Sequence, residues 1–167
     1  AAILESINIS VEAFGIGRNP TKNTPLLLEK YDFDDLNKVG QMVKKEIGFV
    51  PHYIRFPGGS SNTVSRRYCQ GIMSTLTKEV VEKGYQYYDW TCINGDGEGI
   101  KTIKGLKKKA IEEVNGQEDI MFLMHDSANQ GNTVKALPAI LDYLIKKGYQ
   151  FEVVDQYSPT FHHTVQN

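Results

Sequence analysis

Short apolar runs alternate with longer amphipathic stretches along the chain, and this alternation limits the possible folds more than any other feature. The apolar runs fit strands, and the longer stretches fit helices, two of which end at Gly84 and Gly148. Strands that are separated by helices connect through right-handed crossovers, which makes them parallel. The pattern predicts an α/β fold with parallel strands near residues 11–16, 52–56, 86–91, 119–124 and 151–154.

The composition fits one globular domain, residues 1–167, with 40% hydrophobic and 23% charged residues. A formal net charge of −1 gives no reason to expect a nucleic-acid partner. No apolar run approaches the ~18 residues of a membrane span, and the first residues lack the pattern of a signal peptide. Cys69 and Cys92 share no short metal-binding spacing, so buried thiols are the simplest interpretation, and a disulfide stays open.

Three predicted strands lead into polar side chains that a buried core has little use for. Arg55 closes the strand in "HYIRFPGG", Asp96 follows the strand that ends near Cys92, and His125 follows "IMFLM". Ligands of parallel α/β sheets bind at the carboxyl ends of the strands, so these side chains are expected at one rim. Each has an ordinary alternative: an ion pair for Arg55, a turn for Asp96, and strand-end packing for His125. Their coincidence at one rim favours a functional cleft.

Three motifs occur in an order that resembles a known family: "RFPGGSS", "YQYYDWTCINGDG" and "IMFLMHDS". They look like the third, fourth and fifth motifs of the NodB-type polysaccharide deacetylases, carbohydrate esterase family 4. Upstream, "ILESINISVEAFGIG" is similar to a helix end and second strand of that family, and "FHHTVQN" resembles the tail of a Gram-positive bacterial subgroup. The resemblance covers Ile3 to Asn167 and implies a partial (β/α) barrel.

Enzymes of this family remove acetyl groups from N-acetylated or O-acetylated polysaccharides, and the resemblance assigns roles to residues of this chain. His125 would protonate the leaving amine, Asp96 would orient that histidine, and Arg55 would hold the catalytic base. A divalent metal, zinc, is the implied cofactor, because an amide reacts only when its carbonyl is polarised. The implied substrate-binding residues are Trp90, Leu123, Pro57 and Gly58.

The family's metal and base motifs are not found. T-F-D-D-G would precede "ILESINIS", and H-[S/T]-x-x-H would lie between "VEAFGIG" and "RFPGG", where His52 is the only histidine. Phe33-Asp34-Asp35 looks like the core of the first motif, but a helix N-terminus with acidic residues explains it better. His162 and His163 would point to opposite sides of an extended tail and be solvated. The sequence therefore predicts a domain without the first strand and the second-motif segment, and without metal ligands.

Two classes of function follow from this. One is a polysaccharide deacetylase, and the alternative is an inactive carbohydrate-binding or structural descendant that kept the sugar cleft. The implied partner is a polysaccharide such as peptidoglycan or a chitin-like glycan, and the implied location is secreted or at the cell surface. Lost strands would leave open sheet edges, which predicts self-association through them.

Overall fold

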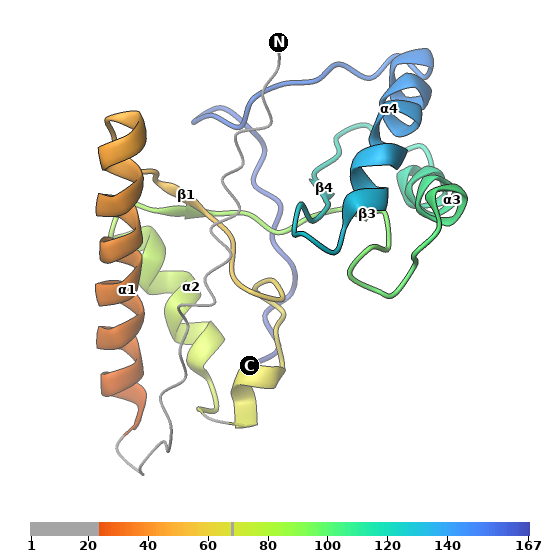
Figure 1. The fold of residues 1–167 in the computed structure, drawn as a ribbon. Helices are drawn as coiled ribbons and strands as arrows, with labels where there is room; N and C mark the ends of the chain where they lie inside the picture. Colours follow the sequence, from red (N-terminus) through yellow and green to blue (C-terminus); the bar gives the residue numbers. More distant parts are fainter. Residues whose placement is uncertain (1–23, 68) are drawn as a thin grey trace. The chain divides into compact units, whose positions relative to one another are not determined.

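The computed structural model describes residues 24–67 and 69–167 (Figure 1). Within this range the chain forms two compact units. The Arg55 unit comprises residues 24–89 and His162–Asn167, and the His125 unit comprises Trp90–Phe161. The strand expected at residues 11–16 lies outside the described residues, and the single domain 1–167 stays a prediction.

The Arg55 unit contains a β-α-β arrangement that follows one long helix. Its elements are α1 (Thr24–Ile47), β1 (Tyr53–Ile54), η1 (Val64–Arg67), α2 (Ile72–Glu82) and β2 (Gln86–Tyr87). The two strands pair in parallel, with Ile54 opposite Tyr87. Parallel strands require a crossover connection, which here is the segment that contains α2.

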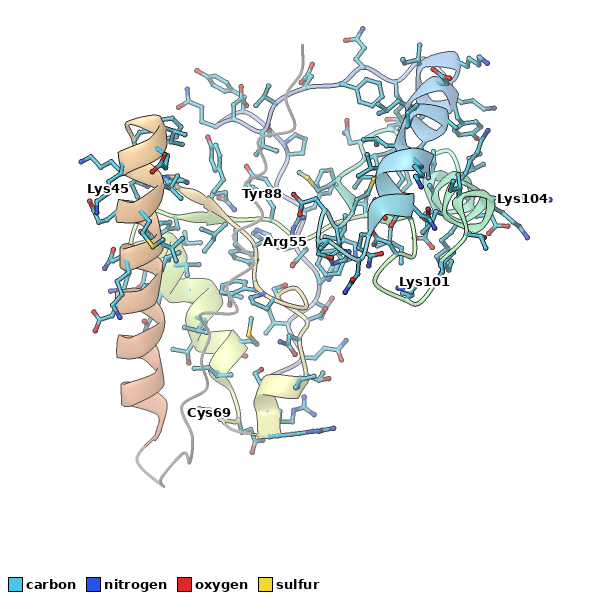
Figure 2. All side chains as sticks on the ribbon, viewed as in Figure 1. Lys45, Arg55, Cys69, Tyr88, Lys101 and Lys104 are labelled. Atoms are coloured by element: carbon cyan, nitrogen blue, oxygen red, sulfur yellow. The ribbon has the colours of Figure 1, made fainter. Side chains whose placement is uncertain are left out.

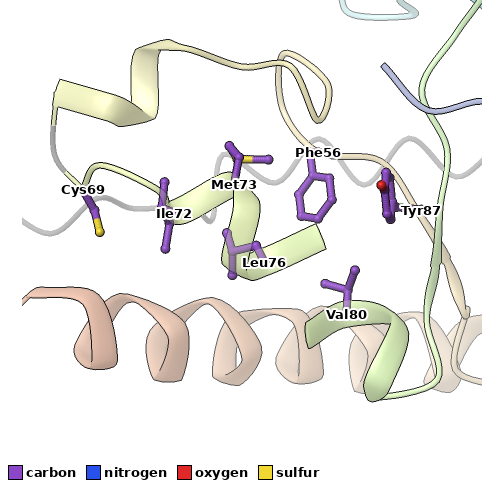
Figure 3. Packing of buried hydrophobic residues seen from close by; sticks show 7 residues of the cluster. All are labelled: Phe56, Cys69, Ile72, Met73, Leu76, Val80 and Tyr87. Atoms are coloured by element: carbon purple, nitrogen blue, oxygen red, sulfur yellow. The ribbon is translucent and has the colours of Figure 1, made fainter. Parts of the chain in front are cut away.

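One face of α2 supplies most of the buried hydrophobic cluster of the Arg55 unit. Four buried α2 residues recur at the spacing of one helical face, and they pack with side chains from the ends of both strands. The cluster consists of Phe56, Cys69, Ile72, Met73, Leu76, Val80 and Tyr87 (Figure 3). Burial of this apolar face holds α2 against β1 and β2.

The Phe33-Asp34 part of α1 is helical, so it is not the strand-end motif that it resembles in sequence. The Phe33 side chain packs against the hydrophobic cluster, and the Lys83 ammonium lies 4.4 Å from its ring centroid. The expectation that these residues form a helix is confirmed. Their place at the helix N-terminus is wrong, because α1 begins at Thr24.

The tail, His162–Asn167, caps the start of α2. The backbone N–H of Gly71, the N-cap residue, donates to Asn167 Oδ1 at 2.9 Å, and Asn167 Nδ2 donates to Ser65 Oγ at 2.7 Å. The backbone N–H of Ser74 donates to the main-chain oxygen of Asn167 at 2.8 Å. The first N–H groups of a helix have no partner within it, and Gly71 has no side chain to supply one. Asn167, distant in sequence, provides the cap.

We expect Asn167→Ala to lower the free energy of unfolding by about 1–2 kcal/mol, because Gly71 and Ser65 lose their partner at a helix start. Urea denaturation of the two proteins measures the difference. Gln166→Ala is the matched control, since the exposed Gln166 side chain makes no part of the cap and its main-chain oxygen accepts from Arg66. Equal destabilisation by both substitutions would contradict the capping role of Asn167.

The His125 unit repeats the strand-helix alternation. Its elements are β3 (Cys92–Ile93), α3 (Ile103–Val114), β4 (Phe122–Leu123) and α4 (Gly131–Lys146). The strands pair in parallel, with Ile93 opposite Leu123. Its buried cluster consists of Cys92, Leu106, Ala110, Val114, Ala136, Ile140 and Leu144. The small side chains of Ala110 and Ala136, both fully buried, leave room for α3 and α4 to pack together.

The predicted strand at residues 86–91 begins as β2, and its backbone changes partners at Asp89 and Trp90. The N–H of Tyr88 still donates to Ile54, whereas the N–H of Thr91 donates to Met121. The segments predicted at 52–56 and 119–124 contain β1 and β4. Both described sheets are parallel and two-stranded, so the expected α/β fold is confirmed, and these strands form no closed barrel.

The strand predicted at residues 151–154 is wrong, because no strand forms there in the described structure. Phe151 and Val153 are 44% and 62% exposed. A strand needs a neighbour for its backbone groups, and none of the described strands pairs with this segment. Large apolar side chains are also exposed elsewhere, including Met42, Phe49 and Tyr157. Self-association stays a prediction.

Both cysteine side chains are buried, and the disulfide that the sequence left open is not formed. Burial raises the pKa of the Cys92 thiol, which keeps it protonated and unreactive. In the described part of the chain, no helix has both the length and the apolar character needed to cross a bilayer.

Candidate functional site

Asp96 lies in a tight turn directly after β3. The backbone N–H of Asp96 donates to Asn94 Oδ1 at 3.1 Å, a local bond typical of Asn in turns. Gly95, between them, has a φ of 79°, which glycine adopts without steric cost. The Asp96 residue is only 3% exposed, so its carboxylate needs hydrogen-bond donors from the protein.

His125, which follows β4, supplies two of those donors. Its ring Nδ1 lies 2.7 Å from Asp96 Oδ1, and its backbone N–H donates to Asp96 Oδ2 at 2.9 Å. Because β3 and β4 are parallel neighbours, the residues that follow them meet at the same end of the sheet. The predicted approach of Asp96 to His125 at this rim is confirmed.

The N-terminal end of α4 supplies two further hydrogen bonds to Asp96. Thr133 Oγ1 donates to Asp96 Oδ2 at 2.8 Å, and Gln130 Nε2 donates to the main-chain oxygen of Asp96 at 3.1 Å. Sequence reasoning missed both residues. The signal was the polar loop before α4, whose last residues fall in the first helical turn, where side chains often bond nearby groups.

The environment of Asp96 keeps its carboxyl ionised. Burial raises its pKa, but hydrogen bonds from the His125 ring and backbone and from Thr133, together with the charge of His125, lower it further. The net pKa of Asp96 is below its ordinary value. An ionised carboxylate only accepts hydrogen bonds, so the proton between the two side chains belongs to His125 Nδ1.

This arrangement leaves the other ring nitrogen of His125 facing away from Asp96. The His125 side chain is 38% exposed, whereas that of Asp96 is 2% exposed. No hydrogen bond within the described residues involves His125 Nε2. A neutral imidazole with its proton on Nδ1 has a basic Nε2, and a charged one can donate a proton from it. The pair can therefore accept or supply a proton at an accessible atom.

Gly97 leaves the space that the imidazole fills. A Cβ atom added at Gly97 would lie 3.0 Å from His125 Cε1 and 3.6 Å from Nδ1. The backbone of Gly97 is not left-handed, so the glycine is required by the close approach of the ring rather than by its own conformation.

The pKa of Asp96 predicts how the protein responds to acid. A carboxyl with a depressed folded-state pKa contributes stability above its unfolded pKa, and this contribution is lost as the pH falls through the folded pKa. Asp96→Asn should remove that part of the acid dependence, measured by urea denaturation from neutral pH down to below pH ~3. Asp126→Asn, at an exposed neighbour, is the control and should leave the dependence unchanged. A wild-type slope in Asp96→Asn would rule out the ionised buried carboxylate.

Gly97→Ala should push the imidazole away from Asp96, because the added Cβ would crowd the ring and the partly exposed His125 can move. The expected result is a changed chemical shift of the His125 ring in two-dimensional NMR, together with a lower thermal midpoint, because the buried Asp96 carboxylate loses one of its donors. Gly131→Ala is the control, since a Cβ there meets nothing within 4 Å. An unchanged His125 signal in Gly97→Ala would show that the ring is not held at this distance.

Arg55 occupies a half-buried position in its own unit. Its Nε donates to the main-chain oxygen of Tyr88 at 3.2 Å. Figure 2 labels both residues. Burial lowers the pKa of Arg55, the charge of Asp89 raises it, and the net pKa is below the ordinary value. Asp89 is thus a carboxylate of the Arg55 unit whose charge acts on Arg55. Convergence of Arg55 with Asp96 and His125 stays a prediction.

Asp89 is a second buried carboxylate, which sequence reasoning missed. It is 0% exposed and accepts from the Ser60 N–H at 2.8 Å, the Ser60 hydroxyl at 2.5 Å and the His163 N–H at 2.7 Å. These bonds tie the "PGGSS" turn and the tail to the end of the "YQYYD" run. The sequence did carry an indication, because Asp89 stands among the aromatic residues of a predicted strand and a buried carboxylate there must find hydrogen-bond donors.

The four predicted substrate-binding residues are divided between the two units. Trp90 and Leu123 are half-buried in the His125 unit, and Pro57 and Gly58 are exposed in the Arg55 unit. Gly58 has a φ of 73°, and the main-chain oxygen of Pro57 accepts from Asn62 Nδ2 at 2.9 Å. A common wall formed by these residues stays a prediction.

The described residues do not fit the metal centre that the family resemblance implies. Among residues 24–67 and 69–167, no three His, Cys, Asp or Glu side chains form a group that could hold a metal ion. The His162 ring stacks on Tyr87 with centroids 3.8 Å apart, and His163 Nδ1 lies 3.1 Å from Ser61 Oγ. The tail histidines have separate partners, as adjacent residues of an extended chain do; His162 is exposed, as expected, whereas His163 is half-buried.

Comparison with known proteins gives a consistent result, although no family model matches the chain. A peptidoglycan-N-acetylglucosamine deacetylase of Bacillus cereus is 30% identical over 122 residues, which cover 70% of this chain and 41% of that protein. A bifunctional xylanase/deacetylase of Pseudobutyrivibrio xylanivorans is 22% identical over 170 residues, covering 92% of this chain and 27% of that protein. The catalytic domain of a peptidoglycan N-acetylglucosamine deacetylase from Eubacterium rectale has a TM-score of 0.78 and 34% identity, over 83% of this chain and 63% of that one.

The chain therefore has the parallel α/β fold of polysaccharide deacetylase catalytic domains. The resemblance inferred from the three ordered motifs is confirmed, since the curated and structural relatives are deacetylases of polysaccharides. The chain spans less than half the length of each curated relative that it matches.

Proposed function

We propose that this chain is part of a hydrolase that removes acetyl groups from an N-acetylated polysaccharide. The observation that carries the proposal is the Asp96–His125 pair at the carboxyl ends of β3 and β4. The buried carboxylate fixes the imidazole by its Nδ1, and the opposite nitrogen stays accessible. Together with the deacetylase relatives, this geometry favours a histidine that transfers protons at the rim of the sheet.

The chemistry of amide hydrolysis requires such a group. Water adds to the acetyl carbonyl carbon, the carbon–nitrogen bond then breaks, and the products are acetate and a free amine on the sugar. The departing nitrogen is a poor leaving group unless it receives a proton. His125 Nε2 supplies that proton, and the ionised Asp96 stabilises the imidazolium before the transfer. Removal of such a general acid costs roughly 10²–10⁴-fold in rate.

The remaining assignments rest on the resemblance. Arg55 would hold the catalytic base, while Trp90, Leu123, Pro57 and Gly58 would line the sugar site. In the resembled enzymes a divalent metal polarises the carbonyl and activates water. No step is assigned to a metal here, because the described residues supply no ligand group for one.

That same observation favours the second candidate, a carbohydrate-binding or structural descendant that does not catalyse hydrolysis. In this case the Asp96–His125 pair would be retained for its structural value. Peptidoglycan or a chitin-like glycan is the proposed ligand in either case, because two of the relatives are named for peptidoglycan N-acetylglucosamine. Because such a polymer lies outside the cell, the proposed location of the protein is secreted or at the cell surface.

Acetate release separates the candidates. We expect the natural protein that carries this sequence to release acetate from chitin oligosaccharides or peptidoglycan in zinc-containing buffer, and His125→Ala to reduce the rate at least about 100-fold. His52→Ala, at an exposed histidine of the Arg55 unit, is the matched control and should keep the wild-type rate.

Glycan binding by calorimetry, without acetate release, would support the second candidate and exclude the first. Neither binding nor release would refute both. Full activity in His125→Ala would leave the deacetylase in place and remove His125 as its acid.

A further inference from the structure

Thr133 uses its hydroxyl in an unusual way for a residue in the first turn of a helix. The residue is 5% exposed, and its backbone N–H donates to the main-chain oxygen of Gln130 at 2.8 Å. Its hydroxyl does not bond the helix backbone but donates to Asp96 Oδ2 at 2.8 Å. A buried hydroxyl costs free energy unless it is bonded, so the side chain is committed to this carboxylate.

The donors to Asp96 are divided between its two oxygens. Oδ2 accepts from Thr133 Oγ1 and from the backbone N–H of His125, whereas the one donor that the described residues offer to Oδ1 is His125 Nδ1. With Oδ2 occupied twice, the carboxylate cannot rotate to offer that oxygen to the ring. The direction of Oδ1, and with it the preferred tautomer of the imidazole, is therefore set in part by Thr133.

The position of Thr133 at the start of α4 fixes its hydroxyl relative to Asp96. Gln130, three residues earlier, donates to the main-chain oxygen of Asp96 at 3.1 Å, so one end of α4 grips both the backbone and the side chain of Asp96. Ala136, three residues after Thr133 in α4, is fully buried in the hydrophobic cluster of the His125 unit. The carboxylate also lies near a helix N-terminus, where the helix dipole favours negative charge.

We infer that Thr133 is a positioning residue for His125, acting through Asp96 to keep the imidazole proton on Nδ1 and Nε2 ready for proton transfer. The role of this proton position in proton transfer rests on the proposed function. The proton position itself can be measured without any activity, because the nitrogen chemical shifts of histidine distinguish its two neutral tautomers.

The test is ¹⁵N NMR of His125 at a pH where its imidazole is neutral. Wild type should show one tautomer, with the proton on Nδ1. Thr133→Val keeps the shape and removes the hydroxyl, so the ratio of the Nδ1–H to the Nε2–H tautomer should fall about fivefold to tenfold, the effect of one lost hydrogen bond. Thr133→Ser keeps the hydroxyl and should restore the wild-type pattern. The Asp96 carboxyl should titrate at higher pH in Thr133→Val than in Thr133→Ser.

Thr102→Val is the matched control. Thr102 caps α3 in the same unit by accepting from the N–H of Gly105 at 3.1 Å, so its loss also weakens a helix start but does not touch Asp96. It should leave the His125 tautomer unchanged. If Thr133→Val does not fold, Thr133→Ala replaces it, because it also removes the hydroxyl that donates to Asp96 and should show the same fall in the tautomer ratio.

A tautomer ratio in Thr133→Val that equals the wild-type ratio would overturn the inference, as would an Nε2–H tautomer in wild type or a changed ratio in Thr102→Val. Absence of deacetylase activity in wild type would instead overturn the proposed function, and the tautomer result would stand.

Discussion

The Asp96 carboxylate is the group on which the candidate site depends. It is buried, it remains ionised, and it receives donors from two separate parts of the chain: the residue after β4 and the first turn of α4. A buried charge without these donors would cost several kcal/mol. The same bonds that make the burial tolerable therefore fix His125 and the start of α4 relative to β3.

Asp89 provides a useful contrast within the same chain. It too is fully buried and accepts three hydrogen bonds, but its donors are Ser60 and the backbone of His163, none of which leaves an accessible acid-base group. Asp89 thus fixes the backbone of the "PGGSS" turn and of the tail, whereas Asp96 fixes the partly exposed imidazole of His125. Burial of a carboxylate alone does not indicate catalysis. What indicates catalysis is the identity of its hydrogen-bond partners and their exposure to solvent.

Much of the architecture could be predicted from local pattern. Helices α2, α3 and α4 follow apolar periodicity and end near the glycines and polar residues that the sequence shows, and β1 and β4 lie within the expected runs. The segment 151–154 is apolar like the other predicted strands but forms none, because an apolar run cannot by itself supply a neighbouring strand. For the same reason, the change of hydrogen-bond partner across Asp89 and Trp90 could not be predicted.

The sequence by itself determined the parallel α/β class, the family resemblance, and the meeting of Asp96 with His125, because residues after adjacent parallel strands must share one rim. Only the tertiary structure decided which further groups complete that pair. Thr133 lies 37 residues from Asp96 in sequence, and Asn167 lies 96 residues from the Gly71 that it caps. Such bonds depend on where a folded chain brings distant groups together, and no local propensity or spacing encodes that proximity.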